Sequence, residues 1–109
     1  MNMELRFEQF NESPVYFFRR CGYHFQGEER GEWSFVMRLS GGDFPRFHIY
    51  AKMDGDDLLL NLHLDQKRPS YEGSHAHAGE YEGPGIIEEG MRIKAFHRPE
   101  YENKNKAFR

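Results

Sequence analysis

Two neighbouring segments, residues 44–53 and 58–65, divide their side chains between two chemically opposite faces. In the first, Phe47, Ile49, Ala51 and Met53 alternate with Arg46, His48, Tyr50 and Lys52; in the second, Leu58, Leu60, Leu62 and Leu64 alternate with Leu59, Asn61, His63 and Asp65. A period of two is typical of antiparallel strands that bury one face. The alternation therefore predicts two strands whose polar residues share one side of a sheet. A slip of one residue would expose four leucines to water.

The connection between these strands is a hairpin, indicated by Asp54-Gly55, a pair that accepts the positive φ angles of tight turns. A loop of residues 54 and 55 would place His48 opposite Asn61. A loop of residues 54–57 would place His48 opposite His63. Both registers keep the polar residues on a common face.

The remaining elements are predicted from weaker patterns. Residues 33–39 alternate and predict a third strand, residues 3–7 allow a short edge strand, and residues 26–32 are polar with two glycines, which indicates a loop. Ser13-Pro14 predicts a helix over residues 14–21, since serine caps the free amides and proline suits the first helical position. After Pro84, the spacing of Ile86, Ile87, Met91 and Phe96 predicts a second helix with these side chains facing inward.

This order of elements predicts an α+β fold. We expect a curled antiparallel sheet of three to four strands, with an N-terminal and a C-terminal helix packed on its apolar face. The length of 109 residues suits one domain, which we place at residues 1–99, followed by a polar C-terminal tail of residues 100–109. Residues 66–85 show no periodicity, and long connections of this kind are commonly functional or disordered.

Composition excludes some classes of protein. The formal charge of −3 provides no global basic field for nucleic acid, and no run reaches the roughly 18 apolar residues that span a bilayer. The single cysteine, Cys21, cannot form an intramolecular disulfide, and the N-terminus lacks the pattern of a secretion signal. We therefore expect a cytoplasmic protein with no membrane contact.

The residues able to perform chemistry concentrate on the polar strand face and in the segment that follows it. His63 and Asp65 are two apart on one strand, and His75 and His77 share that spacing, with Glu80 and Glu82 close behind. Imidazole and carboxylate ligands suit zinc or manganese. The pattern predicts a divalent metal site formed by His63, Asp65, His75 and His77.

Two alternatives use the same face without a metal. His48 and His63 could act as base and acid in a small ribonuclease, with Arg46 stabilising phosphoryl charge and Tyr50 positioning it. The face could also bind nucleic acid or another protein without catalysis, because tyrosines interleaved with Arg46, Lys67 and Arg68 can stack on bases and contact phosphates.

Two short segments resemble the 3′-phosphoesterase domain of bacterial DNA-repair ligases. Leu62-His63-Leu64-Asp65 resembles a Leu-His-Tyr-Asp strand of that family, and Gly79-Glu80-Tyr81 resembles its Gly-Glu-Tyr-Gly segment. The resemblance implies that His63 and Asp65 bind manganese in a phosphoesterase. The chain departs from the family at Asp57, where a histidine would stand, and in the shorter gap between the two segments.

The leading expectation is therefore a metal-assisted phosphoesterase or nuclease-like hydrolase that acts on a phosphate ester or nucleic acid. In it, His63, Asp65, His75 and His77 are the metal ligands, and the catalytic residues are His48, Arg46 and Tyr50.

Overall fold

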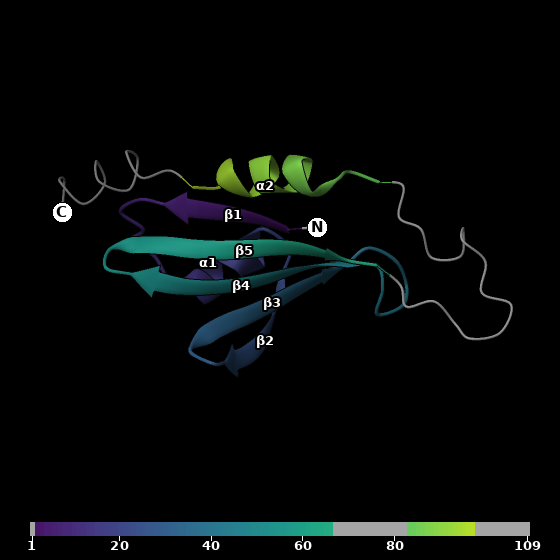
Figure 1. Ribbon diagram of the computed structural model, residues 1–109, viewed down its shortest axis with the longest axis horizontal. Coiled ribbons are helices and arrows are strands. Elements are labelled where there is room, and N and C mark those ends of the chain that lie inside the picture. The colour runs from purple at the N-terminus through teal and green to yellow at the C-terminus, as the bar shows by residue number, and fades with distance from the viewer. Residues whose placement is uncertain (1, 67–82, 98–109) are drawn as a thin grey trace, which may run out of the picture.

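The computed structural model describes residues 2–66 and 83–97, which form one antiparallel sheet and two short helices (Figure 1). The elements in chain order are β1 (Asn2–Phe7), α1 (Pro14–Arg20), β2 (His24–Glu29), β3 (Glu32–Arg38), β4 (Arg46–Asp54), β5 (Asp57–Asp65) and α2 (Ile86–Lys94).

The sheet has five strands in the order β1-β5-β4-β3-β2. The prediction of three to four strands, with a helix from each end of the chain on the apolar face, is wrong. The additional strand is β2, which falls partly on the segment expected to be a loop. Its side chains are nearly all exposed, and a bulge between Phe25 and Gly27 interrupts its pairing with β3, so its sequence carries no alternation of apolar and polar residues.

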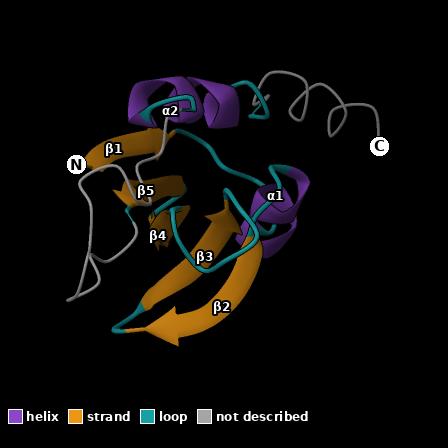
Figure 2. Ribbon diagram, turned by 90° about the vertical axis from the view of Figure 1, so that its right-hand side faces the viewer, coloured by secondary structure: helices purple, strands orange, loops and turns teal. Residues whose placement is uncertain are grey.

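The helices also lie differently from the expectation. The backbone of α2 approaches β1 and β5, whereas α1 approaches β2 at the opposite end of the sheet. Figure 2 shows this separation, with α2 beside β1 and α1 beside β3 and β2. The sheet therefore has a helix near each end, and one polar face remains available along its central strands.

The hairpin of β4 and β5 fixes the register of the polar face. Asp54 pairs with Asp57 across a loop of Gly55 and Asp56, and Gly55 adopts a φ of 61°, the left-handed conformation that favours glycine. In this register His48 lies directly opposite His63, the pairing expected for a loop of residues 54–57, although Asp54 and Asp57 themselves pair and the loop is shorter.

The apolar face carries a core rich in aromatic residues. Phe17 and Phe18 of α1 are fully buried, with the ring of Phe17 5.7 Å from that of Phe7 and the ring of Phe18 4.6 Å from that of Phe35. Leucines 58, 60 and 62 of β5 are at most 2% exposed. The predicted burial of one strand face is therefore confirmed for the middle of β4 and β5, where Phe47, Ile49 and Ala51 are also at most 1% exposed. It is wrong for Met53 near the end of β4, which is 36% exposed.

Helix α2 presents a different face to the core from the one predicted. Ile86 and Ile93 are buried, but Ile87 and Met91 are 64% and 65% exposed. The buried face instead includes Glu89, whose carboxylate accepts hydrogen bonds from Tyr23 Oη at 2.6 Å and from Arg92 Nε at 2.7 Å. Arg92 Nη2 also donates to the carbonyl of Cys21 at 2.7 Å, so this polar network ties α2 to the segment after α1.

Candidate active site on the polar face

The polar face is formed by side chains of β3, β4 and β5 that alternate away from the core. Strand pairing arranges them in rows, with Arg46 opposite Asp65, His48 opposite His63, and Tyr50 between Ser34 and Asn61. Directly opposed side chains on one face of an antiparallel pair lie within contact distance. The structure thus brings together five of the sequence-predicted site residues: Arg46, His48, Tyr50, His63 and Asp65.

His48 is the centre of a hydrogen-bonded chain across three strands. Its Nδ1 lies 3.3 Å from Asp65 Oδ2, and its Nε2 lies 2.8 Å from Ser34 Oγ. A carboxylate can only accept, so Nδ1 carries the proton that it donates to Asp65. In the neutral ring Nε2 then accepts the proton of the Ser34 hydroxyl, and the chain runs from Ser34 through His48 to Asp65.

Burial keeps His48 in this neutral form. Its side chain is 12% exposed, and desolvation lowers the pKa of His48 below its ordinary value, with the opposing attraction of Asp65 the smaller effect. Ser34 is only 2% exposed, so its hydroxyl is poorly placed to attack a substrate. This chain of hydrogen bonds therefore suits the positioning of Asp65 better than the activation of Ser34 as a nucleophile.

Arg46 contacts the same carboxylate oxygen. Its Nε donates to Asp65 Oδ2 at 3.1 Å, and its guanidinium lies over the ring of Phe44, 4.6 Å from the centroid. The ion pair is one-third exposed or less at both side chains. Asp65 Oδ2 is thus fixed from two sides.

The imidazole of His63 is less constrained than that of His48. It meets the ring of Tyr50 edge to face, with 5.9 Å between centroids, and Tyr50 in turn lies 4.4 Å from the ring of His48. Within residues 2–66 and 83–97, the ring of His63 has no hydrogen bond to a protein group, and neither does Asp65 Oδ1. Both groups lie on one side of β5, two residues apart.

The metal ligands predicted at His75 and His77 lie outside the described residues. Among the described residues, no three side chains of histidine, cysteine, aspartate or glutamate gather closely enough to hold a metal ion by themselves. His63 and Asp65 are therefore a pair of potential ligands to which further groups would have to be added.

Ser34 is the site residue that the sequence did not reveal. Its place in the alternation of β3 indicated only that it lies on the polar side of a strand. Its contact with His48 depends on the register of β3 and β4, which the turn after β3 determines and which no local pattern specifies.

No helix in the described part of the chain is long and apolar enough to cross a membrane. The searches of protein-family models, curated proteins and solved structures found no match to this chain.

Proposed function

We propose that the polar face hydrolyses phosphate esters with the help of a divalent cation, zinc or manganese, bound by His63 and Asp65 together with the predicted ligands His75 and His77. The observation that carries the proposal is the asymmetry of Asp65. Its Oδ2 accepts hydrogen bonds from Arg46 and His48, whereas its Oδ1 and the His63 ring, on the same side of β5, have no hydrogen-bond partner among the described residues.

This arrangement suits a metal ligand. Carboxylates that bind metals are themselves hydrogen-bonded by outer groups, which orient them and tune their basicity. Arg46 and His48 would serve in this way for Asp65, and Ser34 would support His48. Because both of its ring nitrogens are engaged, His48 acts in this proposal as a positioning residue rather than as a base that contacts substrate.

The charge balance of the face also supports a bound cation. Arg46 is paired with Asp65, and His48 is neutral, so these three side chains together carry no net charge. A phosphate group needs a net positive environment, and a divalent ion would provide it. A metal at this position supplies Lewis-acid polarisation of the phosphoryl oxygen and a water of lowered pKa.

Two other residues would contact the phosphate. The Arg46 guanidinium uses Nε for Asp65, and its Nη groups can donate to a phosphate oxygen. Burial raises the pKa of Tyr50, so its hydroxyl keeps its proton at neutral pH and can donate a second hydrogen bond. In this proposal both residues have the roles that the sequence analysis expects of them.

The test is hydrolysis of p-nitrophenyl phosphate and bis(p-nitrophenyl) phosphate by the full chain, purified without a histidine tag. We expect release of p-nitrophenol that requires manganese or zinc, stops in EDTA and is lost in His63→Ala. The matched control is His24→Ala, which removes an exposed histidine from β2 and should leave the rate unchanged.

Three results would contradict the proposal. Activity that persists in EDTA and disappears in His48→Ala would favour the metal-free ribonuclease-like site. Salt-sensitive oligonucleotide binding with no hydrolysis would favour a non-catalytic module. Equal loss of activity in His63→Ala and His24→Ala would place the chemistry elsewhere.

A further inference from the structure

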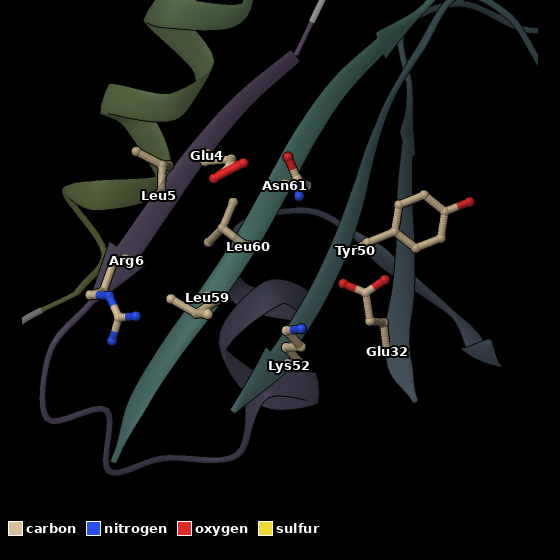
Figure 3. A pocket seen from close by; sticks show the side chains of 9 residues that line it. All are labelled: Glu4, Leu5, Arg6, Glu32, Tyr50, Lys52, Leu59, Leu60 and Asn61. Atoms are coloured by element: carbon tan, nitrogen blue, oxygen red, sulfur yellow. The ribbon is translucent and has the colours of Figure 1, made fainter. Parts of the chain in front are cut away.

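A second feature of the polar face is a hollow lined by Tyr50 and Asn61 among others (Figure 3). In the register of β4 and β5, these two residues form the next row of the polar face beyond His48 and His63. The hollow has a volume of about 390 Å³, and we call it the side hollow; the side chains that line it on the polar side include Glu4, Arg6, Glu32, Tyr50, Lys52 and Leu59. Tyr50 is two residues from His48 on β4, a distance of roughly 6.6 Å along a strand. The side hollow therefore begins close to the proposed phosphate position, since its wall residue Tyr50 also contacts the ring of His63.

The lining of the side hollow is mostly polar, and it includes one aromatic side chain, Tyr50, and one outward leucine, Leu59. Leu59 is a leucine on the outward side of β5 and is only partly buried. Tyr50 forms one wall, and Figure 3 shows its ring projecting from β4 beside the Glu32 carboxylate. The ring is directed away from Leu59, so an aromatic ligand group would stack on Tyr50 alone, and that contact favours such a group.

The charges around the side hollow are predominantly negative. Arg6 is already held by Asp54 at 3.0 Å and by Asp57 at 2.5 Å, so the two cations Arg6 and Lys52 are accompanied by four carboxylates, those of Glu4, Glu32, Asp54 and Asp57. A nucleic acid strand that continued across this region would bring further phosphates close to these carboxylates, and the two sets of negative charges would repel each other. An uncharged or cationic group would meet no such repulsion.

We infer that the side hollow is a subsite for the uncharged or cationic aromatic leaving group of a small aryl phosphate, not for a strand of nucleic acid. The inference rests on the proposed function, because it requires the phosphate to sit beside His63 and Asp65. In the reaction, the oxygen of water bonds to phosphorus, the bond between phosphorus and the aryl oxygen breaks, and the proton that water loses ends on the released phenol.

The test compares phenyl phosphate, glycerol 3-phosphate and a short oligonucleotide bearing a 3′-phosphate, each titrated into the full manganese-loaded protein. Dissociation constants would be measured with the manganese-loaded protein. Amide shifts would be followed by nuclear magnetic resonance with zinc, a diamagnetic ion, in place of manganese. We expect phenyl phosphate to bind about fivefold to tenfold more tightly than glycerol 3-phosphate, because this is the gain in affinity that one aromatic stacking contact gives. The amides of Glu32 and Lys52, which line the side hollow away from the phosphate position, should shift only with the aryl compound.

Variants separate stacking from general damage to the fold. Tyr50→Ala should abolish the preference for phenyl phosphate, Tyr50→Phe should retain it, and Tyr16→Ala, which removes a tyrosine that is 65% exposed on α1, should change nothing. The amide shifts of the wild-type protein keep the inference testable if Tyr50→Ala does not fold.

The inference is overturned if phenyl and glycerol phosphates bind equally, or if the oligonucleotide binds more tightly than phenyl phosphate. Hydrolysis of both small esters without a preference would refute the subsite and leave the proposed function in place. Phenyl phosphate that binds in the side hollow without being hydrolysed would refute the proposed function and leave the aromatic subsite in place.

Discussion

Ser34→Ala tests whether the hydrogen-bonded chain positions Asp65. The substitution removes a hydroxyl that donates to His48 Nε2 over 2.8 Å from a residue only 2% exposed. It leaves an imidazole nitrogen without its partner in a side chain that is 12% exposed. An acceptor stranded in this way costs about 1–2 kcal/mol, and we expect the free energy of unfolding to fall by that amount.

The effect on metal binding is the more informative measurement. Without Ser34, His48 can change its tautomer or rotate, and Asp65 Oδ2 then loses one of its two donors. Substituting groups that orient a metal ligand commonly weakens binding by about 10-fold to 100-fold, and Ser34 acts through His48, so we expect about tenfold. Isothermal titration calorimetry with zinc gives this value, and long-range ¹H–¹⁵N correlation spectra report the His48 tautomer.

A double-mutant cycle distinguishes positioning from a purely structural role. Ser34→Ala should weaken metal binding in the wild-type background and have little further effect in the His48→Ala background, because its influence passes through His48. Ser34→Thr keeps the hydroxyl and should restore the Nδ1–H tautomer. The reasoning is refuted if Ser34→Ala lowers stability but leaves metal affinity and the tautomer unchanged, or if it weakens binding equally in both backgrounds.

Three further predictions concern the fold. Glu89→Ala should lower the free energy of unfolding by about 2 kcal/mol in urea titrations, because it leaves the buried Tyr23 hydroxyl without its acceptor and removes the carboxylate that pairs with Arg92; a loss below 1 kcal/mol would contradict this role. The pKa of His48 is lowered from 6.5 in the folded protein, so below pH 6.5 the unfolded chain binds a proton that the folded chain does not bind, and the free energy of unfolding should fall as pH drops from 6.5 to the folded pKa. His48→Gln should flatten this pH dependence, measured by urea titrations at each pH. An unchanged slope of unfolding free energy against pH would exclude His48 as its source. Gly55→Ala should cost about 1 kcal/mol at its φ of 61°, and an increase in melting temperature would show that the turn relaxes.

The β4 and β5 hairpin was predictable from sequence because its two faces differ so strongly in polarity. The burial of Leu58, Leu60 and Leu62 leaves only one side of β5 for His63 and Asp65, whatever the turn. The choice between two registers was left open, since it depends on whether Asp54 and Asp57 pair across the loop, a matter of backbone geometry that the residue types allow either way.

Other elements could not be predicted, for physical reasons visible in the structure. Strand β2 lies at the edge of the sheet with nearly all its side chains exposed, so burial imposes no pattern on it. In α2, the sequence favoured Ile87 and Met91 as inward residues, but Tyr23 and Arg92 satisfy the carboxylate of Glu89 and allow a charged residue to take the buried position. Whether a charged residue can be buried therefore depends on hydrogen-bond partners that lie elsewhere in the chain, which local sequence patterns do not reveal.

The candidate site could likewise be predicted from the sequence only in part. Local spacing placed His63 and Asp65 on one face, and alternation placed His48 and Arg46 on that same face of the sheet. The shared contact of His48 and Arg46 with a single oxygen of Asp65 follows from the three-dimensional arrangement of side chains. Ser34 enters only through the pairing of β3 with β4.

The most direct test of the account is calorimetric titration of zinc and manganese into the untagged full chain, with His63→Ala, Asp65→Asn and His24→Ala as variants. The account predicts one equivalent of metal bound by the wild-type protein and by His24→Ala, and at least a 100-fold loss of affinity in the two variants of β5. Absence of saturable binding by the wild-type protein, or affinity that is unchanged when His63 and Asp65 are replaced, would contradict the proposed metal site.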